Sequence, residues 1–163
     1  MSKHDDPRLA YTTDLWRPHV VAAVVVERDG RFLFVEEDID GRRVINQPAG
    51  HLDPGETLPA AAAREALEET GWTVDIDALV GVYLLDTEVV GKTFLRFCFA
   101  ATAREFDATR KLDKEIVRTH WWNREELLAH AAMLRSPLVL RAVDDHLGGA
   151  LHPLSLLHDF LRP

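Results

Sequence analysis

Residues 50–72 read GHLDPGETLPAAAAREALEETGW, and this stretch determines the fold that we expect for the chain. Thr57 is a favourable helix N-cap, and Pro59 fits the first turn of a helix, where its missing N–H is not needed. The alanines at 60–63 have high helix propensity, and Gly71 is typical of a helix end. The stretch therefore predicts a tight loop followed by a helix that ends at Gly71.

Three glutamates share one face of this expected helix. Glu65, Glu68 and Glu69 are spaced i, i+3 and i+4, which brings their carboxylates together. Like charges at this spacing destabilise a helix by roughly 0.2–0.5 kcal/mol per pair, and a bound divalent cation reverses that effect. Oxygen ligands select hard cations, with Mg²⁺ first and Mn²⁺ second. The alternative is a solvated acidic face, because glutamate is a good helix former.

The loop before the helix is expected to be tied to it by an ion pair. Glu56 precedes the helix and Arg64 stands beside the glutamates, so a Glu56–Arg64 pair would brace the site. We therefore interpret Glu56 as a structural brace rather than a ligand. Gly50 and Gly55 frame a turn tight enough to bring backbone carbonyls close to an ion.

The spacing of Gly50, Glu56 and the run REALEETGW at 64–72 resembles the signature box of the Nudix hydrolases. Trp72 departs from it, since the family usually has a smaller aliphatic residue there, and we expect Trp72 to pack in the core. The resemblance implies an α+β fold, an α/β/α sandwich with a mixed β-sheet. It also implies an enzyme that hydrolyses a diphosphate linked to another moiety.

The same resemblance implies roles for individual residues. Glu65, Glu68 and Glu69 would bind the divalent ions, together with the carbonyl oxygen of Gly50. The family often has a further acidic residue before a late strand, and Glu115 occupies that place, although it is equally consistent with a surface charge in RKLDKE. Metal ions would lower the pKa of a bound water, and one carboxylate would take its proton. Glu65 is favoured as that base, with Glu115 as the alternative.

The charge of the chain bears on its substrate and partners. The formal net charge is −8 and the pI is near 5.4, which argues against a broad basic surface for nucleic acid. A phosphate-anhydride substrate would be repelled unless a cation bridged it to the protein. Arg42, Arg43 and Arg96 are candidate phosphate clamps, and surface cations are the alternative. Trp16, Trp121 and Trp122 are candidates for stacking on a base, or else belong to the core.

The remaining sequence predicts one domain of mixed α+β type. Residues 1–15 are polar and are expected to be a flexible N-terminal segment, with the hydrolase domain over 16–163. The expected strands span 19–27, 31–36, 79–85, 93–103 and 116–122, with an irregular strand or loop at 44–50, and two further helices span 124–134 and 137–147.

Several sequence features bear on location and assembly. The first residues lack the apolar run of a secretory signal, and no apolar stretch approaches the roughly 18 residues that span a bilayer. We therefore expect a cytoplasmic protein without a membrane partner, either a monomer or a homodimer. The single cysteine, Cys98, rules out an internal disulfide and is expected to be buried in a strand.

Similarity to the Nudix family extends beyond the box. The segments WRPHV, NQPAGHLD, FLRFCFA, LRSPLV and HPLSLLHDF resemble those of the NudJ-type phosphatase branch. That branch releases orthophosphate from nucleoside tri- and diphosphates and acts on hydroxymethylpyrimidine pyrophosphate. The alternatives are a nucleotide-sugar or ADP-ribose pyrophosphatase and, more remotely, a non-catalytic ligand-sensing domain. A sensor would usually carry a DNA-binding module, whereas this sequence retains all three box glutamates and shows no basic helix-turn-helix segment.

Overall fold

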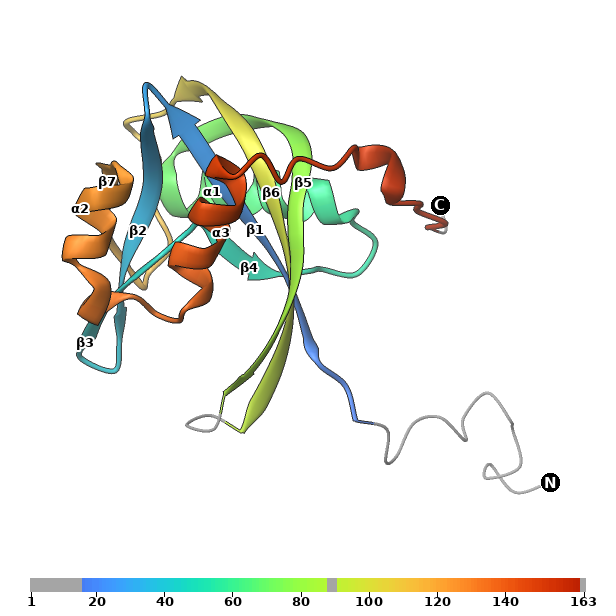
Figure 1. Cartoon of the computed structure of the whole chain (residues 1–163), viewed down its shortest axis with the longest axis horizontal. Helices are drawn as coiled ribbons and strands as arrows, with labels where there is room; N and C mark the ends of the chain where they lie inside the picture. Colours follow the sequence, from blue (N-terminus) through green and yellow to red (C-terminus); the bar gives the residue numbers. More distant parts are fainter. Residues whose placement is uncertain (1–15, 88–90, 162–163) are drawn as a thin grey trace.

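The computed structural model describes residues 16–87 and 91–161, so the segment 1–15 that we expected to be flexible lies outside the described residues. A seven-stranded sheet is flanked by helices (Figure 1). The strands are β1 (His19–Arg28), β2 (Arg31–Ile39), β3 (Arg42–Asn46), β4 (Ala49–His51), β5 (Trp72–Thr87), β6 (Lys92–Phe106) and β7 (Ile116–Trp122). The helices are α1 (Leu58–Thr70), α2 (Arg124–Ala129) and α3 (Leu138–Leu147), with short 3₁₀ turns η2 (Ala131–Met133) and η3 (Leu154–Leu156).

Two tight turns connect the first three strands. Asp29 and Gly30 both have positive φ, at 53° and 72°, and join β1 to β2. Asp40 and Gly41 repeat the pattern at 51° and 82°, between β2 and β3. Two consecutive residues with positive φ match the twist of an antiparallel hairpin, which explains why Asp-Gly predicts both turns.

The sheet is mixed, with the order β3-β2-β1-β6-β5, while β4 pairs with β1 and β7 pairs with β2. The central strand β1 runs parallel to β6 and antiparallel to β2 and β4. Residues 21–26 of β1 are all buried, because layers cover both faces of the sheet at this point.

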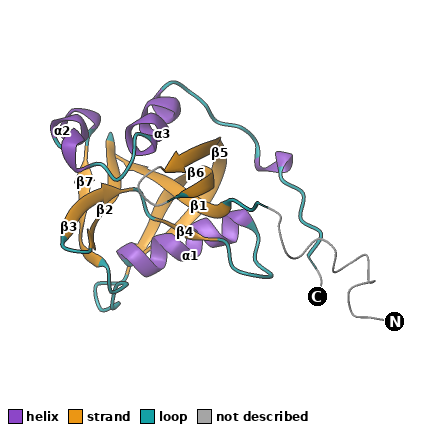
Figure 2. Cartoon of the chain, turned by 90° about the horizontal axis from the view of Figure 1, so that it is seen from below, coloured by secondary structure: helices purple, strands orange, loops and turns teal. Residues whose placement is uncertain are grey.

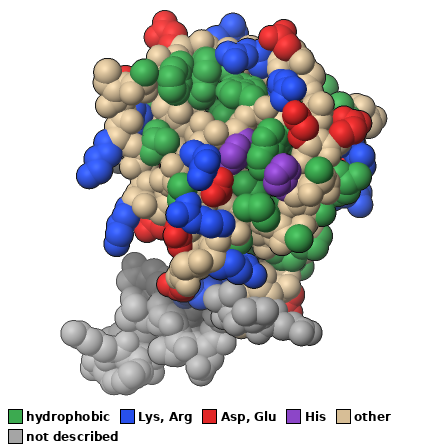
Figure 3. All heavy atoms as spheres, turned by 90° about the vertical axis from the view of Figure 1, so that its left-hand side faces the viewer, with side chains coloured by type: hydrophobic (Ala, Val, Ile, Leu, Met, Phe, Trp, Pro, Cys, Tyr) green, Lys and Arg blue, Asp and Glu red, His purple; other side chains and the backbone are tan. Residues whose placement is uncertain are grey.

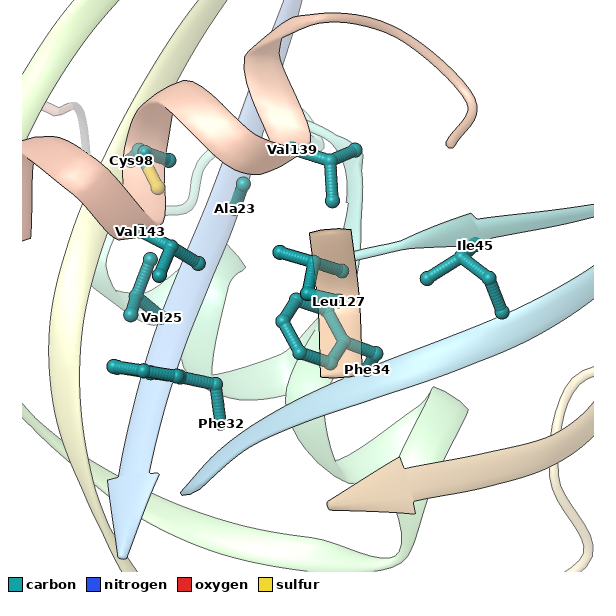
Figure 4. Packing of buried hydrophobic residues seen from close by; sticks show 10 residues of the cluster. Ala23, Val25, Phe32, Phe34, Ile45, Cys98, Leu127, Val139 and Val143 are labelled. Carbon is teal, nitrogen blue, oxygen red and sulfur yellow. The ribbon is translucent and has the colours of Figure 1, made fainter. Parts of the chain in front are cut away.

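Helices cover the two faces of the sheet unequally. In Figure 2, α1 lies on one side of the strands and α2 and α3 lie on the other. Figure 4 shows Ala23 and Val25 of β1 packed with Leu127 of α2 and Val139 of α3. The alternate residues of β1, such as Ala22, pack with alanines of α1. The predicted α/β/α sandwich with a mixed sheet is confirmed.

Several strands extend a few residues beyond their expected ends, and two elements differ more strongly from those expected. The strand expected over 79–85 spans Trp72–Thr87, because it pairs with β6 along this whole length, from Trp72 opposite Phe106 to Thr87 opposite Lys92. The helix expected over 124–134 ends at Ala129. There the chain leaves the helix to pair with β3, where Leu134 bridges Ile45 in parallel. Tertiary pairing thus overrides the helix propensity of the segment between them.

The surface and the remaining core residues complete the description. Cys98 is buried, as expected for a cysteine in a strand, and Trp72 packs against Phe106 with ring centroids 5.0 Å apart. The face at the left of Figure 1 places basic, acidic and apolar side chains next to one another (Figure 3). Within the described ranges, every helix is too short or too polar to cross a bilayer.

Candidate active site

Helix α1 carries the three glutamates as the sequence predicts, and both of its ends are capped. The Thr57 side chain accepts a hydrogen bond from the Ala60 N–H at 3.2 Å, and Pro59 occupies the first turn. Gly71 ends the helix with φ of 75°, and its N–H donates to the Leu67 carbonyl. The caps fix the ends of the helix, while the buried Ala61, Ala62 and Ala66 pack against the sheet and set its rotation. The acidic face is thereby directed at β4 and at the loop before β7.

Glu65 and Glu68 form an acidic cluster with Asp113, a residue that the sequence did not single out. One carboxylate oxygen from each lies within 4.8 Å of the others, close enough to hold a metal ion. The Asp113 N–H donates to the Glu68 carbonyl at 3.2 Å, which anchors the loop to the end of α1. The run RKLDKE contained both Asp113 and Glu115, and spacing alone did not distinguish them.

Glu115 lies outside this cluster. The Glu115 carbonyl accepts a hydrogen bond from the Asp38 N–H at 2.9 Å. Glu115 is exposed and helps to line a cavity of about 560 Å³. Glu37 and Arg135 line the same cavity. The structure therefore brings Glu65 and Glu68 together and leaves Glu115 at a neighbouring hollow.

Glu69 and Gly50 occupy the tight junction between α1 and β4. The buried Glu69 carboxylate accepts a hydrogen bond from the Ala49 N–H at 3.0 Å. Burial raises the pKa of Glu69 to about 8, and the nearby carboxylates of Glu37 and Glu65 add to the shift. A Cβ atom on Gly50 would lie 2.1 Å from Glu65 Oε1, so only glycine permits this approach.

Arg64 joins the loop, the helix and the acidic cluster. Its guanidinium donates to Glu56 at 2.7 and 3.1 Å and to Glu65 at 2.6 Å. It also donates to Glu68 at 3.0 Å and to the His51 carbonyl at 2.9 Å. The pKa of Arg64 is raised, chiefly by its hydrogen bond to Glu56. Burial nevertheless raises the pKa of Glu65, so desolvation outweighs the guanidinium at that carboxylate.

A second cavity, of about 490 Å³, lies beside Gly50. Its wall includes the rings of His51 and Phe94 and the cationic side chains of Arg42, Lys92, Arg96 and Arg135. The two rings lie 6.4 Å apart between centroids, and His19 contacts both of them. The cavity thus combines an aromatic wall with positive charge.

Arg96 is the most deeply buried of these cations. It donates to Asn46 at 3.2 Å and to Gln47 at 2.6 Å, which are neutral amide oxygens. Its Nε is buried without a hydrogen-bond partner, and among the described residues no carboxylate forms an ion pair with it. Desolvation lowers the pKa of Arg96. A buried cation in this condition favours an anionic ligand in the cavity.

The other two predicted arginines differ in their surroundings. Arg42 lines the 490 Å³ cavity. Arg43, the next residue, instead forms ion pairs with Asp38 at 3.2 Å and Glu36 at 3.5 Å. Consecutive residues of a strand point to opposite faces, which accounts for the difference.

The tryptophans considered for base stacking lie away from the cavity. Trp121 packs edge-on against Trp72, and Trp122 stacks on His120 with centroids 4.2 Å apart. Trp16 is largely exposed. The aromatic wall instead comes from His51 and Phe94. These residues lie in the segments NQPAGHLD and FLRFCFA, which resemble the NudJ-type branch but did not by themselves indicate a stacking role.

Comparison with known proteins agrees with this geometry. The family model described as the NUDIX domain matches residues 16–142. "Phosphatase NudJ" of Escherichia coli strain K12 is 41% identical over 150 residues, covering 91% of this chain and 96% of that protein. The protein of the same description from Shigella flexneri matches equally well.

Solved structures extend the comparison. A NUDIX hydrolase from Nitrosomonas europaea has a TM-score of 0.87 and 42% identity, over 88% of this chain and 98% of that one. A UDP-X diphosphatase shares only 15% identity, at a TM-score of 0.67 over 90% of this chain and 70% of its own, and so shares the fold alone. From its family match, its curated relatives and its fold, this chain belongs to the Nudix family and is a Nudix hydrolase.

Proposed function

We propose that this Nudix hydrolase is a Mg²⁺-dependent phosphatase that releases orthophosphate from nucleoside tri- and diphosphates and from hydroxymethylpyrimidine pyrophosphate. The observation that carries the proposal is the pairing of an acidic cluster with a cationic cavity. Glu65, Glu68 and Asp113 converge within 4.8 Å, and Gly50 beside them lines the cavity that holds Arg96. The 41% identity to proteins described as phosphatases supports the choice of reaction.

The donor set fits a hard divalent cation. Glu65, Glu68, Glu69 and the Gly50 carbonyl are the proposed ligands, and Asp113 joins them because its carboxylate lies in the cluster. All of these donors are oxygens, which favours Mg²⁺, with Mn²⁺ as a substitute. Burial raises the pKa of both Glu65 and Glu69, so a cation would stabilise their charged forms. When bound, Mg²⁺ neutralises phosphate oxygens and lowers the pKa of a coordinated water.

The cavity residues would bind the substrate. Arg96 lines the cavity and carries a positive charge that no carboxylate of the described residues pairs with, so it attracts a phosphate, and Arg42 adds positive charge along the same wall. The rings of His51 and Phe94 offer a surface on which a nucleobase or pyrimidine can stack. Arg43 contributes less under this proposal, because its guanidinium is already paired with Asp38 and Glu36.

A carboxylate must accept the proton of the attacking water. We assign this role to Glu65, which lies in the acidic cluster, with Glu115 as the alternative base from the neighbouring cavity. Water attacks the terminal phosphorus, the bond from that phosphorus to the bridging oxygen breaks, and orthophosphate leaves. The leaving group is the rest of the substrate, a nucleoside diphosphate from a triphosphate or a monophosphate from a diphosphate, and Arg64 and Glu56 would keep the loop in place.

A substrate panel with Mg²⁺ tests this function. It contains ATP, ADP, hydroxymethylpyrimidine pyrophosphate, ADP-ribose and a UDP-sugar, scored by the phosphate species released. We expect orthophosphate from the first three and slower cleavage of the last two. Preferential cleavage of ADP-ribose or the UDP-sugar into two monophosphates would establish a nucleotide-sugar or ADP-ribose pyrophosphatase instead.

A further inference from the structure

Arg135 lies where the two cavities meet. Together with Ile39 it lines both the 490 Å³ cavity beside Gly50 and the 560 Å³ cavity that contains Glu115. Its segment pairs with β3, since the Arg135 N–H donates to the Ile45 carbonyl at 2.9 Å. The backbone of Arg135 is therefore held by this hydrogen bond at the boundary between the two cavities.

A buried carboxylate holds the other end of this side chain. Arg135 Nη1 lies 2.5 Å from Glu37 Oε1, and the Glu37 residue is only 5% exposed. The second oxygen, Glu37 Oε2, is buried and has no hydrogen-bond partner among the described residues. Glu37 thus has Arg135 as its one charged hydrogen-bond partner in that part of the chain, which restricts where the guanidinium can lie.

The guanidinium retains donors for a ligand. Its bond to Glu37 is the one side-chain hydrogen bond of Arg135 within residues 16–87 and 91–161, and 43% of the side chain is exposed. A guanidinium has five N–H donors, so several remain directed elsewhere. A phosphate oxygen in the cavity is a suitable acceptor for a planar, charged donor of this kind.

The two cavities differ in charge. Among residues 16–87 and 91–161, the lining of the cavity beside Gly50 contains no acidic residue and includes Arg42, Lys92, Arg96 and Arg135. The other is lined by Glu37, Asp38, Asp40 and Glu115, against Lys114 and Arg135. A phosphate chain is therefore stabilised on one side of Arg135 and repelled on the other.

We infer that Arg135, positioned by Glu37, binds the terminal phosphate of the substrate and blocks passage from the cationic cavity into the acidic one. The enzyme would then select substrates whose phosphate chain ends in a free phosphate. A substrate with a second organic group beyond its phosphates must extend past Arg135. This inference rests on the proposed function and adds the residue that decides between terminal and internal cleavage.

The test compares substrates whose phosphate chain has a free end with two-ended substrates, which carry an organic group at both ends of the chain. We would measure kcat and KM for ATP and tripolyphosphate, and for ADP-ribose and diadenosine tetraphosphate, in wild type, Arg135→Ala, Arg135→Lys and Glu37→Gln. For Arg135→Ala we expect kcat/KM on ATP and tripolyphosphate to fall about tenfold or more, mainly through KM, with no fall on the two-ended substrates. Arg135→Lys should recover part of the loss, because it restores the charge without the fork.

Arg104→Ala and Glu37→Gln separate a specific role of the Arg135 guanidinium from a general effect of removing an arginine. Arg104 is also a half-exposed arginine with one carboxylate partner, Asp75, so Arg104→Ala should leave the substrate ratio unchanged. Glu37→Gln should raise KM for ATP in the wild-type background and have no further effect in Arg135→Ala. Melting temperatures report whether each variant is folded. If Arg135→Ala does not fold, Arg135→Lys still tests the role of Arg135.

An equal loss on both kinds of substrate, or no loss on either, overturns the role of Arg135. If wild type prefers ATP, and the ratio of kcat/KM on ATP to kcat/KM on the two-ended substrates is unchanged in the Arg135 variants, this inference alone fails. If wild type prefers the two-ended substrates, the proposed function fails together with it.

Discussion

Glu69 is the carboxylate of α1 at which burial and charge conflict most strongly. Its pKa of about 8 arises mainly from desolvation, although the Ala49 N–H donates to it. A folded-state pKa above the unfolded value means that the native protein holds this proton more tightly. Stability is then greatest below about pH 4.5 for this group and declines as pH rises towards 8. A bound cation would remove the conflict by stabilising the charged form.

We predict that Glu69→Gln lowers kcat about 10²-fold or more while the protein remains folded, because one hard ligand is lost. In EDTA, the variant should also melt at least about 2 °C higher than wild type at pH 8, and the difference should shrink at pH 5. Thermal melts at both pH values measure this. An unchanged kcat with unchanged Mg²⁺ activation would show that the carboxylate does not bind the ion.

Gly50→Ala provides a test at the other side of the junction. The added Cβ would meet Glu65 Oε1 at 2.1 Å, so the carboxylate must move. We expect kcat to fall about 10²-fold and the Mg²⁺ concentration for half-activation to rise. Gly148→Ala is the matched control, since Gly148 has an ordinary φ of −74° and lies at the end of α3. Equal activities in the two variants would contradict the close approach of β4 to Glu65.

Sequence alone predicted the box carboxylates but not all of their neighbours. Glu65 and Glu68 follow from helical spacing, which is local and regular. Asp113 lies in an irregular loop whose course depends on a hydrogen bond to the Glu68 carbonyl, and local pattern does not reveal such a contact. The role proposed for Arg135 does not follow from the sequence either, because it depends on two cavities that form only in the folded chain.

At the scale of elements, the contact between the 51–56 loop and α1 organises the site. Arg64 connects Glu56, the His51 carbonyl and two glutamates of the helix, so one side chain joins two segments. The capped helix and both Asp-Gly hairpins were predictable, since capping and turn chemistry are local. The early end of α2 was not, because its cause is pairing with β3.

We predict that Arg64→Ala destabilises the protein by about 1–3 kcal/mol, because it leaves the partly buried Glu56 and Glu65 without their partner. Activity should also fall, since the loop loses its attachment. Urea unfolding gives the stability change. Arg31→Ala serves as the control: it breaks an exposed pair with Glu126, which should contribute little to stability. Equal destabilisation in both variants would argue against the brace.

The whole molecule carries a net charge of −8 and yet contains a cationic cavity next to its acidic cluster. The cationic cavity therefore attracts a polyphosphate, whereas the acidic cluster repels it. A divalent cation bound to the carboxylates would remove that repulsion. The sandwich holds both parts on rigid elements, with α1 on one face and the 134–139 segment leading into α3 on the other (Figure 2).

This charge distribution predicts a strict requirement for a divalent ion. Activity should disappear in excess EDTA and return with Mg²⁺ or Mn²⁺, because the acidic cluster cannot approach a phosphate chain unaided. Raising ionic strength should weaken substrate binding by screening Arg42 and Lys92 more than the buried Arg96. Full turnover in EDTA would rule out the metal-dependent mechanism.

The most direct test of the account is the position of the bond that water breaks. ATP hydrolysed in ¹⁸O-labelled water with Mg²⁺ should give ADP as the first nucleotide product, with the label in orthophosphate. Attack at the terminal phosphorus requires this outcome, and mass spectrometry of both products reads it directly. AMP with pyrophosphate as the first products, with the label in either, would contradict terminal attack.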